Sequence, residues 1–182
     1  MGRSGNVGKF LWAAMVLLLI AGSQEGWSQA GGPGNWEFFA SPTRNPVEPR
    51  WGSYSDIRRF EREEAAARAN YCPSSGCVIR LDRLAVTPKR VSRGQPVRLD
   101  LTYTILTADD VGIPVTISRE LFFQGVSVGK SSARNLRTPN GTFEQRVEFT
   151  LPPASKPGTY TLKAVISTGY GQDEKTVEFR VD

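Results

Sequence analysis

The chain has 182 residues, of which 39% are hydrophobic and 23% charged, so it can bury the core of one domain and carry further segments. It contains no histidine, which excludes histidine-dependent catalysis, histidine-ligated metals and covalently attached c-type haem. The net charge of +5 is modest and lies mostly after residue 76. Such a charge is typical of a solvated surface, although it could favour anionic partners.

The N-terminus has the pattern of a secretory signal peptide, which we assign to residues 1–30. Basic residues precede an apolar run over residues 10–21, which is shorter than the roughly 20 residues of a membrane-spanning helix. Ser28 and Ala30 place the preferred cleavage site after residue 30, with residues 21–23 as a second candidate. We therefore expect export to the periplasm or the extracellular space, with an uncleaved membrane anchor as the alternative.

Residues 31–54 are expected to form an irregular or disordered tether, because closely spaced prolines interrupt every period of 2 or 3.6 residues. Aromatic side chains are unusual in disordered segments, and this tether is rich in them. Two interpretations stay open: a docking segment that orders on a partner, or side chains that cap an open end of the next domain. The candidate docking residues are Trp36, Phe38, Phe39, Trp51 and Tyr54.

A short helix is predicted over residues 55–70. Ser55 or Asp56 can cap its N-terminus, glutamates and alanines favour helix in its middle, and Asn70 is a suitable stop. Its apolar stripe is thin, so the helix is expected to lie on the surface of the next domain.

Residues 71–77 contain the only two cysteines of the chain, Cys72 and Cys77. In an exported protein this spacing predicts a disulfide that closes a small loop. The spacing does not match the redox Cys-x-x-Cys pattern, and a structural zinc site needs four ligands. A redox or metal role is therefore the weaker alternative, as are free or intermolecular thiols.

Residues 78–182 predict an all-β domain, since hydrophobic and polar residues alternate with period 2 between turn signals. Seven short strands without intervening helices indicate a two-sheet antiparallel sandwich. The sequence Asn140-Gly141 is the strongest hairpin signal. The strands are expected near residues 79–86, with a register change at Asp82-Arg83, and near 97–105, 115–123, 126–128, 143–151, 160–166 and 177–181.

Arg119 interrupts this alternation, because it takes the apolar phase between Ile117 and Leu121. Two explanations are open. A β-bulge could turn the side chain outward, or the guanidinium could pair with a buried acid. The bulge is the preferred interpretation.

Several short motifs resemble those of bacterial immunoglobulin-like domains, a group that includes fibronectin type III-like, macroglobulin-like and cell-adhesion-related modules. The resemblance covers residues 78–182 and implies a seven-stranded immunoglobulin-like sandwich with a bias towards binding. It also implies that the hydroxyl of Tyr160 bonds a nearby backbone group, as in a tyrosine corner. The motifs are Val-Ser-Arg-Gly-Gln-Pro-Val (91–97), Gly-Ile-Pro-Val (112–115), Asn-Gly (140–141), Leu-Pro-Pro (151–153) and Pro-Gly-Thr-Tyr-Thr-Leu (157–162).

Four acidic residues fall in loops that this kind of sandwich brings to one end. They make a weak candidate for a calcium site, which needs six to eight oxygen ligands, and a solvated acidic rim is the preferred alternative. We expect no other metal, no cofactor and no catalytic residue. The four acids are Asp109, Asp110, Asp173 and Glu174.

The leading hypothesis is an exported, non-catalytic module of the cell envelope that binds another exported or envelope protein through its sandwich and its tether. The alternative is a carbohydrate- or small-ligand-binding accessory domain, for which Phe122 and Tyr170 are the only candidate platform aromatics. No nucleophile–base pair is visible, so we expect no enzyme activity. We also expect no nucleic-acid binding, and membrane contact only through an uncleaved signal segment.

Overall fold

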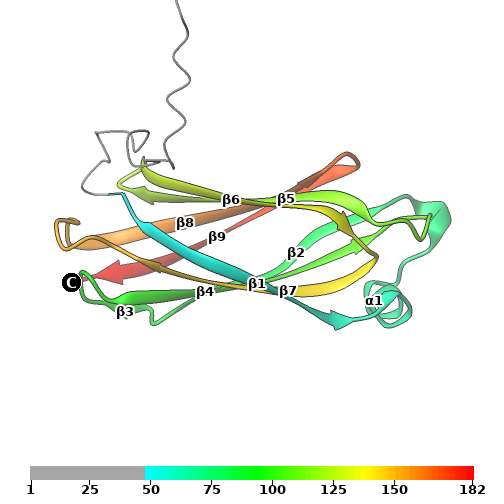
Figure 1. Ribbon diagram of the computed structural model, residues 1–182, viewed down its shortest axis with the longest axis horizontal. Helices are drawn as coiled ribbons and strands as arrows, with labels where there is room; N and C mark the ends of the chain where they lie inside the picture. Colours follow the sequence, from blue (N-terminus) through cyan, green and yellow to red (C-terminus); the bar gives the residue numbers. More distant parts are fainter. Residues whose placement is uncertain (1–47) are drawn as a thin grey trace, which may run out of the picture. The chain divides into compact units, whose positions relative to one another are not determined.

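The computed structural model describes residues 48–182, which form two β-sheets packed face to face (Figure 1). The predicted signal peptide and three of the docking candidates, Trp36, Phe38 and Phe39, lie outside the described residues. The elements are β1 (Arg50–Phe60), α1 (Arg62–Ala69), a 3-10 turn (Pro73–Ser75), β2 (Val78–Thr87), β3 (Arg90–Val91), β4 (Pro96–Leu106), β5 (Ile113–Phe123), β6 (Val126–Thr138), β7 (Gly141–Thr150), β8 (Gly158–Thr168) and β9 (Gly171–Val181).

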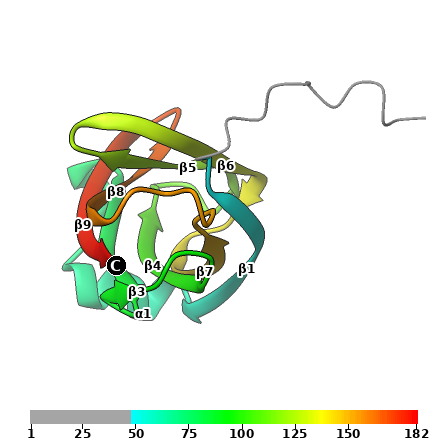
Figure 2. The ribbon, with the colours of Figure 1, turned by 90° about the vertical axis from the view of Figure 1, so that its left-hand side faces the viewer.

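The four-stranded sheet has the order β1-β7-β4-β2, and the five-stranded sheet has the order β3-β9-β8-β5-β6. All strand pairs are antiparallel except β3 and β9, which run parallel. The prediction of an all-β, two-sheet sandwich is therefore confirmed, whereas the prediction of seven antiparallel strands is wrong, because β1 and β3 add to the seven and β3 pairs in parallel. Seen from one end, the two sheets form separate layers, with β1 and β6 at the same side (Figure 2).

The period-2 pattern decides which face of each strand enters the core. In β4, Val97, Leu99 and Leu101 are at most 1% exposed, whereas Arg98 and Asp100 between them point to the other face. The same alternation in β5, β7 and β8 places apolar residues between the two sheets, where burial of each large side chain stabilises the fold by about 1.5–3 kcal/mol. The predicted register change in β2 is also confirmed, between Leu81 and Arg83.

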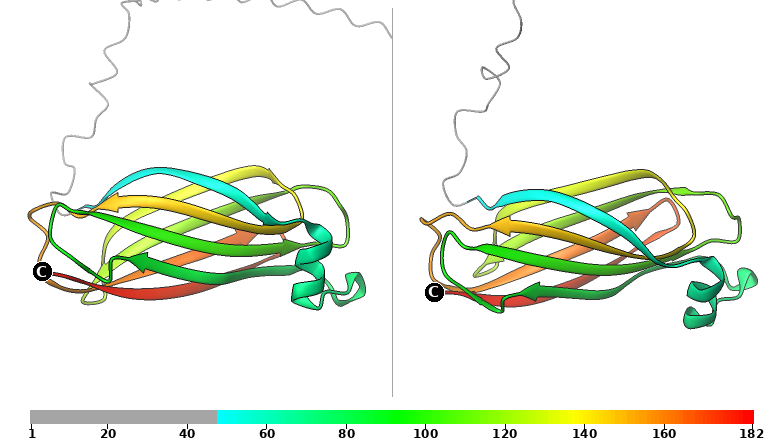
Figure 3. Two further views of the ribbon diagram at one scale, coloured as in Figure 1. Left: turned by 90° about the horizontal axis from the view of Figure 1, so that it is seen from below. Right: turned by 60° about the horizontal axis from the view of Figure 1, so that its bottom comes forward.

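Residues 50–60 form strand β1, so the prediction of an irregular segment up to residue 54 and a helix from residue 55 is wrong there. β1 pairs with β7 from Arg50 opposite Thr150 to Phe60 opposite Thr142. The available edge of β7 satisfies the backbone groups of these residues, and this pairing outweighs their modest local preference for helix. Helix α1 is confined to residues 62–69 and lies at one end of the sandwich (Figure 3).

The end of α1 agrees with the prediction, because Asn70 adopts a left-handed conformation (φ 49°) and its N–H bonds the last turn. Ala65 is 1% exposed, so this face of the helix packs on the sandwich. Arg62 fastens the helix to the β4–β5 loop, since its guanidinium donates to the carbonyl of Ala108 at 3.1 Å and lies 3.2 Å from the Asp110 carboxylate.

Strand β6 is much longer than the predicted 126–128, because it continues to Thr138. The chain then crosses from the five-stranded to the four-stranded sheet, so Asn140-Gly141 does not form the predicted hairpin. Asn140 is instead buried, and its side chain holds the β4–β5 loop. Its Oδ1 accepts from the Thr107 N–H at 2.9 Å, and its Nδ2 donates to the Asp109 carbonyl at 2.9 Å.

Candidate functional site: the β1–β6 side of the sandwich

The two sides of the sandwich differ in how they are closed. On one side, β2 and β9 pack against each other, and the Leu81 N–H donates to the Asp173 carboxylate at 2.8 Å. On the other side, β1 pairs only with β7 and β6 only with β5 within residues 48–182. The outer edges of both strands therefore present backbone N–H and C=O groups without a sheet partner. We call this the open side.

Strand β6 contributes small side chains and positive charge to the open side. Its inward-facing residues are opposite inward-facing residues of β5, such as Ser131 opposite Arg119. It contains three basic residues and no acidic one. Two apolar side chains, Val126 and Leu136, are each 66% exposed. The inward-facing small residues are Gly129, Ser131, Ala133 and Asn135, and the basic residues are Lys130, Arg134 and Arg137.

The start of β1 rests on β6 at a glycine. A Cβ on Gly129 would lie 2.6 Å from the Cγ of Pro49 and would collide with its Cδ, so only glycine fits at this point of the strand. Pro49 is buried by this contact. Glu48 and Pro49, the first described residues, therefore lie beside β6.

The inward face of β1 stays accessible on the open side. Tyr54, Asp56 and Arg58 are in register with core-facing residues of β7, yet all three are exposed, Tyr54 by 45%. The Arg58 guanidinium lies 5.5 Å from the centroid of the Phe143 ring, which is a cation–π geometry. Beneath them Gln145 and Val147 of β7 are buried, so the side chains of β1 form the accessible surface here.

Arg119 lies beneath this open side and is 2% exposed. The preferred prediction, a bulge that turns it outward, is wrong. Its pairings with Ala164 and Ser131 are regular, and the register shifts of β5 fall elsewhere. The alternative, a pair with a buried acid, is met only in part: the acid whose charge acts on Arg119 is Asp56, but Asp56 is exposed and forms no ion pair with it. The Nε and Nη2 of Arg119 are buried without a hydrogen-bond partner among the described residues.

Asp56, Tyr103, Arg119 and Gln145 form a polar cluster between the sheets, with the Tyr54 ring 6.0 Å from the guanidinium carbon. Gln145 Nε2 donates to the Asp56 carboxylate at 2.9 Å. Burial raises the pKa of Asp56, although Gln145, the charge of Arg119 and Tyr103 oppose this shift. Burial also lowers the pKa of Arg119, opposed by Asp56, and raises the pKa of Tyr103. The cluster ties the edge strand β1 electrostatically to β5.

The predicted docking aromatics within the described residues have different roles. Trp51 packs on Phe149 with ring centroids 4.9 Å apart, so it belongs to the core and anchors β1. This contact fits the interpretation in which the aromatic side chains cap the domain, and a docking role for Trp51 stays a prediction. Tyr54 is exposed on the open side, where a partner can reach it.

An apolar hollow of about 260 Å³ lies at the β5–β6 turn, close to the start of the described chain. The turn residues Gln124 and Gly125 both have positive φ, which matches the right-handed twist of a tight hairpin. The hollow can accept an apolar side chain at the beginning of the β6 edge. It is lined by Phe123, Gln124, Val126, Val128, Lys156 and Tyr160.

The structure does not bring the four predicted calcium ligands together. Asp110 pairs with Arg62, Asp173 accepts from the backbone of β2, and Glu174 lies 2.6 Å from the Lys163 ammonium. Within residues 48–182 no group of three or more acidic or cysteine side chains could hold a metal ion. The prediction fails because Asp173 and Glu174 lie in strand β9, not in a loop next to Asp109.

Cys72 and Cys77 are free, exposed thiols, so the predicted disulfide is not formed in this structure.

The predicted bond between the Tyr160 hydroxyl and a nearby backbone group is confirmed, because this hydroxyl donates to the Lys156 carbonyl at 2.8 Å. Sequence reasoning missed the role of Asp56, which it treated as a helix cap. The signal for that role was Arg119 itself, since an arginine in an apolar phase requires a nearby acid.

The proposed aromatic platform for carbohydrate is not assembled. Phe122 is half-buried and in register with Thr161, whereas Tyr170 follows Thr168 at the far end of β8. Seven residues of strand separate the two positions by about 23 Å.

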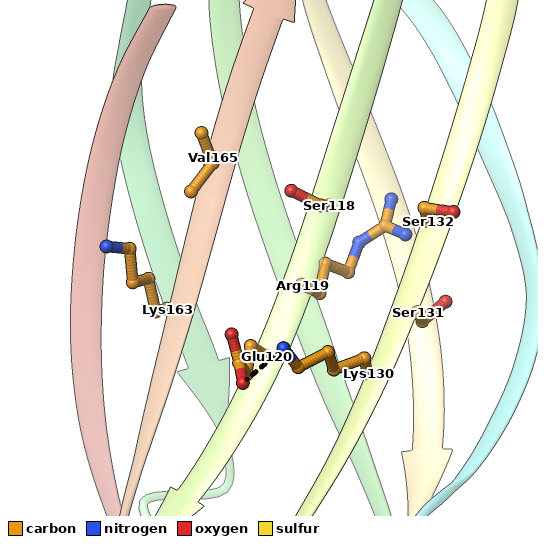
Figure 4. A pocket seen from close by; sticks show the side chains of 8 residues that line it. All are labelled: Ser118, Arg119, Glu120, Lys130, Ser131, Ser132, Lys163 and Val165. Atoms are coloured by element: carbon orange, nitrogen blue, oxygen red, sulfur yellow. Dashed lines mark ion pairs between the residues drawn. The ribbon is translucent and has the colours of Figure 1, made fainter. Parts of the chain in front are cut away.

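A polar depression of about 410 Å³ on the outer face of the five-stranded sheet contains serines and the 2.9 Å Lys130–Glu120 ion pair (Figure 4).

No protein-family model and no curated protein matches the chain. Solved structures match only in part. An alkylpurine DNA glycosylase from Pseudomonas fluorescens is 12% identical with a TM-score of 0.41, over 57% of this chain and 30% of that one. A β-glucosidase from Listeria innocua is 16% identical with a TM-score of 0.40, over 58% and 16%. A conjugative transposon lipoprotein from Bacteroides eggerthii is 17% identical with a TM-score of 0.34, over 57% and 95%.

The chain thus spans less than a third of the glycosylase and the glucosidase that it resembles. Similarity at these scores carries no conclusion about family or activity. Within residues 48–182, the single α-helix has eight residues and is too short and too polar to cross a membrane.

Proposed function

We propose that the protein is an exported, non-catalytic interaction module of the cell envelope that binds another exported protein by strand addition to β6. The observation that carries the proposal is the 13-residue β6 strand, whose outer edge has no partner within residues 48–182. An unpaired edge of this length can form a continuous ladder with an incoming extended segment. Export is supported by the signal-peptide pattern of residues 1–30.

The chemistry of β6 favours an acidic partner strand. Lys130 is already paired with Glu120, whereas Arg134 and Arg137 form no ion pair with a described acid. Opposite charges across an antiparallel pair stabilise it by about 0.2–1 kcal/mol each. Leu136 and the apolar hollow at the β5–β6 turn add places for apolar side chains of the partner.

The tether would supply a second contact, because the chain enters the domain at Pro49, beside β6. Its aromatics Trp36, Phe38 and Phe39 would then act on the side of the sandwich where the partner strand binds. Linking two weak contacts in this way raises the overall affinity without a larger single interface.

The immunoglobulin-like arrangement is part of this proposal. It is supported by the parallel pairing of β3 with β9, by the order β9-β8-β5-β6 facing β2-β4-β7, and by the tyrosine-corner bond of Tyr160. Strand β1 would be an addition to that plan, because it occupies the edge beyond β7.

The alternative function, binding of a carbohydrate or small ligand, would use the polar depression on the outer sheet face. Its serines and lysines can form hydrogen bonds with sugar hydroxyls. The separation of Phe122 from Tyr170 argues against it, because no stacking surface accompanies those groups. Retardation in gels that contain soluble glycans would support this alternative.

Site-specific photocrosslinking in the native cells tests the proposal. A photoreactive residue at Leu136, on β6, should give an adduct with one discrete envelope protein. The matched control is Val111 in the β4–β5 loop, which is similarly exposed at 69% and should give none. Arg134→Glu should weaken the adduct, whereas the same charge change at Arg83 on β2 should not. Equal adducts at both positions, or none at Leu136, would contradict strand addition.

A further inference from the structure

Cys72 and Cys77 lie at the two ends of one tight turn between α1 and β2. The Ser75 N–H donates to the Cys72 carbonyl at 2.9 Å, which closes the 3-10 turn Pro73–Ser75. Gly76 then reverses the chain with φ 99°. Every residue from Cys72 to Cys77 is exposed, so reagents in solution can reach both sulfurs.

The two cysteines differ in their surroundings. The Sγ of Cys72 lies 3.0 Å from the Ser74 hydroxyl, in hydrogen-bond range. The hydroxyl and the backbone N–H of Ser74 lower the pKa of the Cys72 thiol. The thiolate is the reactive form of cysteine, so the turn raises the fraction of Cys72 that can act as a nucleophile near neutral pH.

We propose that Cys72 is a reactive thiol that exchanges with disulfides, and that Cys77 resolves the resulting mixed disulfide. The Cys72 thiolate attacks one sulfur of the incoming disulfide, and the other half of that reagent leaves as a thiolate. Cys77 loses its proton and attacks the Cys72 sulfur, which releases the second half. The protein loses two electrons as its S–S bond forms, and the reagent gains two as its own S–S bond breaks. The two leaving thiolates take up the two protons.

The turn has room for the change of conformation that ring closure requires. A Cβ on Gly76 would meet no atom within 4 Å, so the space beside this residue is open. Its positive φ is a conformation that glycine adopts without strain. Exchange would convert the exposed turn at the end of the sandwich into a closed loop that links α1 covalently to the start of β2. The inference does not rest on strand addition at β6.

The full chain, purified with a reductant, is mixed at pH 7 with oxidised glutathione, and the adducts are located by mass spectrometry. A parallel arm uses an oxidised Cys-x-x-Cys protein, which distinguishes a protein disulfide from a small one as the faster source. The wild type should form the Cys72–Cys77 bridge in at least one arm. Cys77→Ser should accumulate the mixed disulfide on Cys72, and Cys72→Ser should react more slowly by about tenfold.

Ser74→Ala should slow modification of Cys72 by about threefold or more, because it removes the hydroxyl that stabilises the thiolate. Ser75→Ala is the matched control, since the Ser75 side chain bonds the Cys72 carbonyl and not its sulfur. Equal reactivity of Cys72 and Cys77 would overturn the proposal. So would a Ser74→Ala rate equal to that of Ser75→Ala, or the absence of the bridge in both arms.

Discussion

The buried guanidinium of Arg119 and the nearby acid Asp56 give a quantitative prediction about how β1 is held. Asp56→Asn keeps the shape of the side chain, and its amide oxygen can still accept from Gln145, so the substitution removes only the charge. Arg119 is 2% exposed and would lose the carboxylate that balances it. Breaking a fully buried pair destabilises by about 3–5 kcal/mol, and because Asp56 lies on an exposed strand we expect about 2 kcal/mol.

Arg119→Met reverses this expectation, because an apolar side chain of similar length needs no counter-charge. Exchange of a buried ion pair for apolar residues is often neutral or stabilising by about 1–4 kcal/mol. In the Arg119→Met background, Asp56→Asn should therefore change the free energy of unfolding by less than about 0.5 kcal/mol. The coupling energy between the two sites should be about 1.5 kcal/mol or more.

Urea denaturation of the four proteins, followed by far-UV circular dichroism at pH 7, measures this cycle. Asp182→Asn is the control, because it removes an acid from an exposed pair with Arg180 and should cost at most about 1 kcal/mol. An equal effect of Asp56→Asn in both backgrounds would refute the reasoning, since it would show that the Asp56 charge does not act on Arg119.

Three further predictions concern stability and are measured by urea denaturation. Gly129→Ala should destabilise the protein by about 1–3 kcal/mol, because the alanine Cβ collides with Pro49. Limited proteolysis should then cleave the variant earlier near residue 49. An unchanged stability and an unchanged cleavage rate would contradict the contact. Asn140→Ala should destabilise by about 2–4 kcal/mol through the loss of its buried hydrogen bonds, and a loss below about 0.5 kcal/mol would show that the bonds do not hold the loop. Burial alone would raise the pKa of Asp100, but its bonds with Arg146 and Arg98 lower it below 3.8. Its contribution is thus present above pH 3.8 and lost as the pH falls through the folded value, and Asp100→Asn should remove that part of the acid dependence.

The unpaired edge of β6 also explains its composition. Exposed edge strands promote aggregation, and natural proteins limit this with charged side chains and covered positions. Here Arg134 and Arg137 repel a second copy of the same edge, and Pro49 covers Gly129. The same positive charges attract an acidic strand. One set of residues therefore both opposes self-association and selects a partner.

Local chemistry was sufficient to predict much of the sandwich. Alternation in β4 follows directly from the pleat of a strand with one face in the core, and the turn at Gln124-Gly125 contains a glycine, which tolerates positive φ. Asn70 ends α1 for the same reason. The Tyr160 hydroxyl bond was also expected, although from a resemblance to known domains and not from local chemistry.

The remaining features depend on contacts between distant residues. Residues 50–60 form a strand because they pair with the edge of β7, which lies about 90 residues later in the chain. The local propensity of residues 50–60 contains no information about that edge. Asp56 acts on Arg119 only because the pairing of β1 with β7 brings the two residues together, and Asn140 is buried because its side chain meets the β4–β5 loop. The sequence by itself determined the alternation, the turns and the helix end, since these arise from neighbours along the chain. Only the tertiary structure decided which edges stay open and which polar groups are paired, since both depend on what the folded chain brings together in space.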